Sequence, residues 1–209
     1  MTLSIVNLKN EIFGPVTVDV GAGQSMIVAG VSGSGKTRFL RAVADLDEAE
    51  GDVLLNGCSF RSQPAYDWRR QVRFVPATSG WWFEIVRPHF TVSDDLYEAM
   101  DILELRRELL DSQLRDISTG EQQRLSFLRS IQDKPAVLLL DEPTSALDVR
   151  SISGVEVLID RELKRGAIIL LASHSAEQVE KYGQRQLIFQ VGGSAYLTDG
   201  VDVSEVGTV

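Results

Sequence analysis

The sequence predicts a single α/β domain with a mostly parallel sheet, an N-terminal antiparallel part and an inserted helical subdomain. Short apolar runs at 25–29, 136–140 and 167–172 have the length of buried strands and alternate with helical patterns. Such runs are typical of parallel strands covered by helices on both faces. Between about 91 and 132, leucines are dispersed among charged residues, which favours a helical block.

The N-terminal part is predicted to be partly antiparallel. Residues 16–20 alternate between apolar and polar side chains, as a half-buried strand does. Asn56-Gly57 lies between apolar residues within the segment 53–60, which is a strong signal for a hairpin turn. After a glycine-rich loop, apolar residues recur at helical spacing and predict a helix: Phe39, Leu40, Val43 and Ala44.

The C-terminal part continues the alternation of strands and helices. A helical pattern covers about 150–164. Residues 186–191 and 194–198 flank Gly192-Gly193 and predict a second hairpin. We expect one domain over residues 1–209, with the core formed by 1–79 and 134–209 and the helical subdomain by 80–133.

Composition and charge exclude several classes of protein. The chain has 21 basic and 30 acidic residues, a formal charge of −9, which disfavours nucleic acid as a partner because phosphate backbones are bound by clustered Lys and Arg. Cys58 is the only cysteine, so no intrachain disulfide can form, which fits a reducing cytoplasm. The start lacks a signal-peptide pattern, and the apolar runs are far shorter than the roughly 20 residues of a membrane span. We expect a cytoplasmic protein that reaches a membrane only through a partner.

Residues Gly30 to Thr37, GVSGSGKT, match the Walker A phosphate-binding pattern and follow a predicted strand. The glycines allow successive backbone N–H groups to face a phosphate, and the following helix adds its positive dipole end. Lys36 is expected to reach the β- and γ-phosphates of ATP, and the Thr37 hydroxyl to bind Mg²⁺. The expected nucleotide-binding residues are Gly30, Val31, Ser32, Gly33, Ser34, Gly35, Lys36, Thr37 and Arg38.

Two carboxylates, Asp141 and Glu142, end the apolar strand 136–140. The carboxyl end of a buried parallel strand borders the crevice where ligands bind. Asp141 is expected to hold Mg²⁺ through water, and Glu142 to orient and deprotonate the attacking water. Alone, the pair could equally be a solvated acidic turn. Together with the phosphate loop it predicts ATP hydrolysis with ATP and Mg²⁺ as cofactors.

Residues 117–124, ISTGEQQR, resemble the signature motif of the ABC (ATP-binding cassette) family, usually written LSGGQ or LSGGEQQR. Ile117 replaces the usual Leu, and Thr119 replaces the first Gly. Ser118 and Glu121 also form a capping-box pattern at the start of a predicted helix, whose N–H groups are an anion site. The resemblance implies that this segment binds the γ-phosphate of ATP held by the opposite subunit. The segment's expected contacts are Ser118, Thr119, Gly120, Glu121 and Gln122.

The order of further motifs extends the resemblance over nearly the whole chain. Ser118 lies 23 residues before Asp141, and His174 lies 33 residues after Asp141, like the family's switch histidine. The resemblance implies a P-loop NTPase (RecA-like) core and catalytic roles for Lys36, Glu142 and His174. It also implies two chains that close head to tail around two ATP molecules, and a separate transmembrane permease that they drive from the inner face of the cell membrane. The segment that resembles the D-loop is Ser145, Ala146, Leu147 and Asp148.

Two positions depart from the family pattern. Ala77 occupies the place of the usual Q-loop glutamine and has no oxygen to offer to Mg²⁺ or water. Either Thr78 or Ser79 compensates, or this contact is absent. Phe13, 23 residues before Lys36, is the best candidate for the aromatic residue that stacks on adenine, and a core phenylalanine is the alternative.

Three consecutive aromatic residues, Trp81, Trp82 and Phe83, follow the altered Q-loop. They cannot all face one core from a strand, so at least one is expected near the surface. We hypothesise that they form a docking patch for the membrane partner. Packing within the helical subdomain is the alternative.

Three other kinds of protein share a phosphate loop. A P-loop kinase needs neither the signature segment nor a switch histidine. An ABC-type DNA-repair or chromosome ATPase needs long heptad arms, whereas 82 residues without sustained heptads separate Lys36 from Ser118. An ABC-type regulatory protein that binds ATP, hydrolyses it weakly and has no transport role stays open, because of Ala77.

Overall fold

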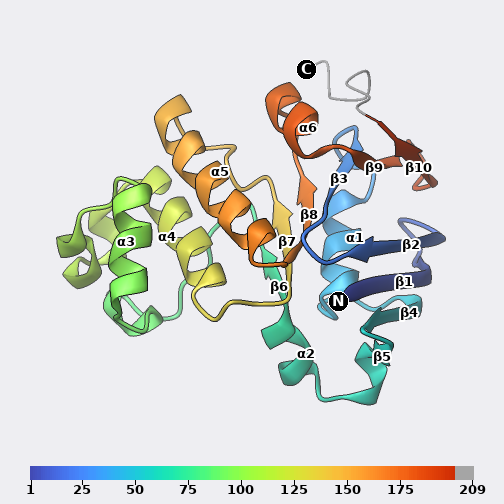
Figure 1. Cartoon of the computed structure of the whole chain (residues 1–209), viewed down its shortest axis with the longest axis horizontal. Coiled ribbons are helices and arrows are strands. Elements are labelled where there is room, and N and C mark those ends of the chain that lie inside the picture. Colours follow the sequence, from blue (N-terminus) through green and yellow to red (C-terminus); the bar gives the residue numbers. More distant parts are fainter. Residues whose placement is uncertain (201–209) are drawn as a thin grey trace.

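The computed structural model describes residues 1–200 and builds them around two sheets (Figure 1). The larger sheet has the strand order β10-β9-β3-β8-β7-β6 within the described residues. Its neighbouring strands are parallel except for β10, which is antiparallel to β9. The strands are β3 (Ser25–Gly30), β6 (Val72–Val75), β7 (Val137–Asp141), β8 (Ile168–Ala172), β9 (Arg185–Phe189) and β10 (Ala195–Asp199).

The smaller sheet is antiparallel, with the order β2-β1-β4-β5. Its strands are β1 (Thr2–Lys9), β2 (Val16–Gly21), β4 (Glu50–Leu55) and β5 (Cys58–Ser59). Asn56 (φ 53°) and Gly57 (φ 80°) form the tight turn between β4 and β5, as the Asn-Gly pair predicts, because both central residues of such a turn need positive φ.

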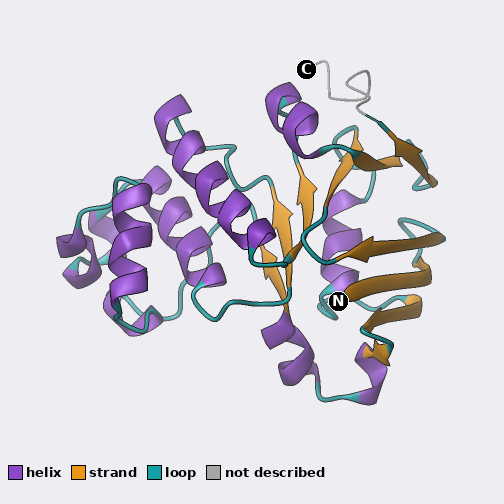
Figure 2. Ribbon diagram, viewed as in Figure 1, coloured by secondary structure: helices purple, strands orange, loops and turns teal. Residues whose placement is uncertain are grey.

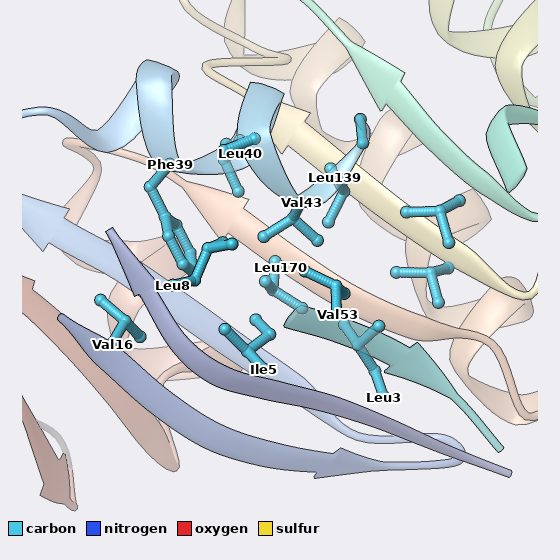
Figure 3. Close-up of a cluster of buried hydrophobic side chains, with 14 of the residues drawn as sticks. Leu3, Ile5, Leu8, Val16, Phe39, Leu40, Val43, Val53, Leu139 and Leu170 are labelled. Carbon is cyan, nitrogen blue, oxygen red and sulfur yellow. The ribbon is translucent and has the colours of Figure 1, made fainter. Parts of the chain in front are cut away.

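Helix α1 (Lys36–Val43) lies between the two sheets (Figure 3). Its buried face places Phe39, Leu40 and Val43 in one apolar cluster with residues of both sheets. Figure 3 shows Leu3, Ile5 and Val53 of the antiparallel sheet and Leu139 and Leu170 of the parallel sheet in this cluster. Helix α1 therefore packs against both sheets, and this packing fixes the position of the loop that precedes the helix.

The other face of the parallel sheet is covered by helices, which Figure 2 colours purple. Consecutive residues of a strand point to opposite faces. Leu139 accordingly belongs to the cluster around α1, whereas Leu138 and Leu140 pack with the helices on the other face. The helices on this face are α4 (Thr119–Ile131), α5 (Val149–Lys164) and α6 (Ala176–Tyr182), and α3 (Asp94–Ile102) packs on α4 and α5. Helix α2 (Ala65–Gln71) lies at the end of the sheet and buries Trp68 in the cluster around α1.

The block from 91 to 132 is only partly helical. Helices α3 and α4 are joined by a segment with short 3₁₀ turns at Arg107–Asp111 and Leu114–Asp116. Leu109 and Leu110 are buried there, so these leucines serve the core without a continuous helix. A separate subdomain at 80–133 stays a prediction.

The hairpin predicted around Gly192-Gly193 is present as β9 and β10. Across residues 1–200, no helix combines the length and apolarity needed to cross a bilayer.

Gly154, in the middle of α5, is required by close packing against α3. A Cβ atom at this position would lie 2.6 Å from the carbonyl oxygen of Ile102. Gly→Ala normally stabilises a helix interior by up to about 1 kcal/mol. Here we expect Gly154→Ala to lower the free energy of unfolding by about 1–3 kcal/mol, because the backbone must shift.

Urea denaturation measures this difference. Ser153→Ala, at an exposed neighbouring position, is the control and should be close to neutral. A Gly154→Ala protein as stable as the wild type would contradict the close contact.

Candidate active site

The carboxyl ends of β3, β8 and β7 lie side by side and carry the chemical groups that the sequence singles out. Strand β8 pairs with β3 on one side and with β7 on the other. A pocket of about 400 Å³ opens at this edge, where α/β folds bind their ligands. Its lining residues are Ile12, Ser32, Gly33, Gly35, Lys36, Thr37, Arg38, Asp141, Glu142 and His174.

The phosphate loop after β3 has the backbone shape that the motif requires. Gly30 has φ 129°, and a Cβ there would lie 2.2 Å from the Phe189 carbonyl oxygen. Gly35, directly before α1, has φ 108°. Only glycine adopts such conformations without strain. Ser34 Oγ is buried inside the loop without a hydrogen-bond partner in the described structure, which suits a loop that receives phosphate oxygens.

Lys36 is folded back onto its own loop. Its ammonium donates to the carbonyl oxygens of Gly30 (2.6 Å) and Val31 (3.0 Å). Burial lowers the pKa of Lys36, and the nearby carboxylates of Glu142 and Asp141 oppose this effect. A lysine in this setting is held at the floor of the pocket with carbonyl groups as its partners, and an anion would be a stronger partner.

Thr37 and Asp141 form an oxygen pair at the base of the pocket. The Thr37 hydroxyl donates to Asp141 Oδ2 at 2.9 Å. Burial raises the pKa of Asp141, while the Thr37 hydrogen bond and the charge of Lys36 lower it. A buried carboxylate beside a hydroxyl is a hard oxygen donor set of the kind that Mg²⁺ prefers. These two residues therefore fit the predicted Mg²⁺ position.

Glu142 is held in an unusual backbone conformation. Its φ is 51°, in the left-handed region that non-glycine residues rarely occupy. Its N–H donates to the Ala172 carbonyl oxygen (3.0 Å), and its own carbonyl accepts from Gln123 Nε2 (3.2 Å) and Ser145 Oγ (3.1 Å). The turn after β7 is thus fixed by hydrogen bonds to β8, to α4 and to Ser145 of the turn itself.

The side chains of Glu142 and His174 meet in the pocket. His174 Nε2 lies 3.1 Å from Glu142 Oε1. Burial raises the pKa of Glu142, and the neighbouring His174 and Lys36 partly oppose this rise. A more basic carboxylate beside an imidazole is suited to accept a proton from a bound molecule.

Comparison with known proteins decides the family. A family model described as ABC transporter matches residues 13–145, which is more than half of the chain. The chain belongs to the ABC transporter family. Members of this family bind and hydrolyse ATP, and this chain is an ATPase of that class, as the sequence predicts.

Several curated proteins are similar over most of the chain. ABC transporter I family member 17 of Arabidopsis thaliana is 30% identical, over 82% of this chain and 70% of its own length. Protein STAR1 of Oryza sativa subsp. japonica is 32% identical, over 93% of this chain and 60% of its own. Phosphate import ATP-binding protein PstB 2 of Natronomonas pharaonis is 29% identical, over 85% and 71%. The first and the third of these names support the predicted role in transport.

Solved structures confirm the predicted fold. An ATP binding subunit of an ABC transporter superposes with a TM-score of 0.84 at 23% identity, over 95% of this chain and 90% of that one. A bacterial Atm1-family ABC exporter with ATP bound gives a TM-score of 0.80 at 21% identity, over 93% of this chain and 38% of that one. The α/β P-loop core with an antiparallel part is thus the ABC ATPase fold.

The segment that resembles the ABC signature lies outside the phosphate pocket of its own chain. Ser118 caps α4, its hydroxyl accepts from the Glu121 N–H, and Glu121 Oε2 accepts in turn from the Ser118 N–H. The predicted capping box is present. Thr119, Gly120 and Gln122 belong to the same helix start, and none of the five signature residues lines the pocket.

The segment that resembles the ABC D-loop connects the turn of Glu142 with α5. Ser145 Oγ donates to the Glu142 carbonyl, and Asp148 caps α5 by accepting from the N–H and hydroxyl of Ser151. Hydrogen bonds from Ser151 lower the pKa of Asp148. Ala146 and Leu147 complete the segment, in which the Leu147 N–H bonds the Thr144 carbonyl.

The predicted adenine-stacking role of Phe13 is wrong. Phe13 is 2% exposed and packs edge to face on Phe39 and Phe189, with ring centroids at 5.7 and 6.3 Å. No face of its ring is open to a nucleotide. The preceding residue, Ile12, is 44% exposed and lines the pocket. Spacing along the chain did not show which of the two neighbours points inward.

The altered Q-loop does not reach the pocket in this conformation. Ala77 and Thr78 are exposed, and Ser79 Oγ donates to the Gln122 carbonyl on α4 (3.3 Å). Neither Thr78 nor Ser79 lines the pocket. Gln123, whose Nε2 donates to the Glu142 carbonyl at 3.2 Å, was not among the predicted site residues. Its spacing of four residues from Phe127, a core residue of the same helix, could have marked it as facing inward.

Phe13 is expected to support stability without touching the nucleotide. Phe13→Leu should lower the free energy of unfolding by about 1–2 kcal/mol, because the ring fills a packed cluster. The ATP dissociation constant of the folded variant should stay within about twofold of wild type.

Ile12→Ala is the matched comparison. It should weaken ATP binding by about 5- to 10-fold through the loss of roughly 1 kcal/mol of apolar contact, measured by titration calorimetry. A tenfold loss of ATP affinity in Phe13→Leu alone would restore the stacking role.

Proposed function

We propose that this chain is the ATP-hydrolysing motor subunit of an ABC transporter, in which two copies close head to tail around two ATP molecules and drive a separate membrane permease. One observation carries the proposal. The pocket holds the phosphate loop, Asp141, Glu142 and His174 together, whereas the signature helix starts elsewhere on the chain. A site that needs both elements must be completed by a second copy, in a two-fold arrangement.

ATP would be held mainly by its phosphates. The loop amides and the N-terminus of α1 supply fixed positive dipoles. Lys36 would exchange its carbonyl partners for the β- and γ-phosphate oxygens. Thr37 and Asp141 would hold Mg²⁺, which neutralises charge that develops on the transferring phosphoryl group.

Glu142 is the proposed general base. Its buried carboxylate, with a raised pKa, would orient the attacking water and accept its proton. The left-handed φ of Glu142 ends the strand conformation directly after Asp141, and the two adjacent carboxylates would take different roles. His174, 3.1 Å from Glu142, would contact the γ-phosphate and keep the carboxylate in place.

The signature segment would act on the ATP of the partner copy. The first amides of a helix have no partner within the helix, and the capping box uses the Ser118 and Glu121 amides together with the Ser118 hydroxyl. The remaining amides at the start of α4, at Thr119 and Gly120, would bind the γ-phosphate. Closure would then depend on ATP, and hydrolysis would separate the two copies.

The aromatic patch formed by Trp81, Trp82 and Phe83 is the proposed permease contact. Trp82 is 64% and Phe83 50% exposed. The backbone N–H groups of both residues donate to His89 Nε2 (3.2 Å each), and Arg129 lies over the rings of Trp81 and Trp82 at 4.5 Å. The patch borders a pocket of about 390 Å³. A rigid, exposed aromatic surface of this kind is suited to a protein partner, which would bring this chain to the cytoplasmic face of the membrane.

A regulatory ATP-binding protein with weak hydrolysis is the second candidate. Ala77 favours it, since the loop that carries this residue offers no oxygen to the pocket. A steady-state ATPase assay separates the two candidates, because the motor subunit must turn over ATP repeatedly.

Glu142→Gln tests the proposed base. Turnover should fall by about 10²- to 10⁴-fold, because the amide cannot accept the proton. ATP binding should be preserved, and an ATP-dependent dimer should accumulate in size-exclusion chromatography. Hydrolysis near the wild-type rate would contradict the assignment.

Trp82→Ala tests the proposed docking patch. Loss of an exposed aromatic anchor should weaken co-purification with the permease by about 30-fold, equivalent to roughly 2 kcal/mol. Tyr196→Ala, which removes an aromatic residue exposed on β10, is the control and should not change it. Intact association of Trp82→Ala together with a lower melting temperature would assign the patch to packing.

A further inference from the structure

A chain of buried polar side chains connects the loop of His174 with the turn of Glu142. Its centre is Gln178, in the first turn of α6, which is 1% exposed. Gln178 Oε1 accepts from the Ser173 hydroxyl at 2.7 Å, and Gln178 Nε2 donates to Thr144 Oγ1 at 3.1 Å. One side chain thus joins the segments that follow β7 and β8.

The hydrogen bonds around Ser173 determine the orientation of the Gln178 amide. Ser173 Oγ accepts from the Ser175 N–H at 3.0 Å. Its own proton is therefore free to be donated to Gln178 Oε1. The amide nitrogen must then face Thr144 Oγ1, which accepts from it. The donor and acceptor roles along the bridge are therefore fixed, and the oxygen and the nitrogen of the Gln178 amide each have a hydrogen-bond partner.

Each end of the bridge lies next to one member of the pair in the pocket. Ser173 and Ser175 flank His174 on both sides in the chain. Thr144 lies two residues after Glu142, inside the turn that holds the left-handed backbone. On the sheet side, the segments of Glu142 and His174 are joined by the β7–β8 ladder and by the hydrogen bond from Glu142 N–H to the Ala172 carbonyl, and the two side chains make their own 3.1 Å contact. The bridge through Gln178 adds a second connection between the same two segments, beyond the ends of β7 and β8.

Stability alone does not require a glutamine here. A buried amide must satisfy both its oxygen and its nitrogen, and its net contribution to folding is small. A leucine of similar volume would fill the same space without these demands. The polar bridge has a directional effect that a leucine lacks, because it sets the distance between two loops.

We propose that Gln178 is a positioning residue, which sets the geometry of Glu142 and His174 by tying the His174 loop to Thr144. The inference rests on the proposed roles of Glu142 and His174. It adds a residue outside the pocket, one that touches neither nucleotide nor metal. A displacement of about 1 Å in such a pair can cost up to about 100-fold in rate.

The test uses two single variants and their double combination in the full chain. Gln178→Leu keeps the volume and removes both hydrogen bonds, and Thr144→Val removes the acceptor of one of them. Each should lower kcat by about 10-fold or more with KM for ATP within about twofold, because only the transition-state geometry changes. The double variant should lose no more than about the larger single loss, since both changes break the same bridge.

Gln186→Leu is the matched control. Gln186 is also fully buried, and its amide donates to the carbonyl oxygens of Gly183 and Gly200, away from the pocket. It should lower the melting temperature and leave kcat of the folded protein unchanged. Thermal unfolding of all variants is recorded beside the ATPase assay, and Thr144→Val carries the test if Gln178→Leu does not fold.

Two results would overturn the inference: a kcat within about twofold of wild type in the folded single variants, or losses that multiply in the double variant. Glu142→Gln, measured in parallel, separates this failure from that of the proposed function. If Glu142→Gln abolishes turnover and Gln178→Leu does not affect it, only the positioning role fails.

Discussion

The parallel register of β3, β8 and β7 is the constraint on which the site depends. Ala172 of β8 pairs with Val28 on one side and with Asp141 on the other. This row places the start of the phosphate loop, the carboxylate pair and the His174 loop directly beyond the same edge. Clusters on both faces hold the register, because a slip by one residue would turn every strand side chain to the wrong face.

Burial at this edge gives the site its electrostatic character. It lowers the pKa of Lys36 and raises the pKa values of Asp141 and Glu142. Buried charges of this kind are costly, and they are concentrated at functional sites for that reason. The triphosphate and a divalent cation would supply the opposite charges that the pocket lacks. The affinity for such ligands would then arise from the same burial that shifts these pKa values.

The sequence predicted those features of the fold and the site that are determined by residues close together in the chain. Buried strands, the Asn56-Gly57 turn, the phosphate loop and the capping box at Ser118 are each encoded within a few neighbouring residues. It failed where the answer depends on contacts across the fold. The spacing of Phe13 from Lys36 does not reveal that its ring packs on Phe189, and Gln178 looks like any polar residue of a short surface helix. Their roles follow from neighbours far away in the sequence.

The central claim is that the site is shared between two copies, with the phosphate loop of one facing the signature segment of the other. Lys36→Ala and Ser118→Arg should each abolish ATP hydrolysis when assayed alone. Mixing the two purified variants creates heterodimers in which one of the two sites has both elements intact. We expect the mixture to regain ATPase activity. A mixture as inactive as its components, with heterodimers present, would contradict the shared site.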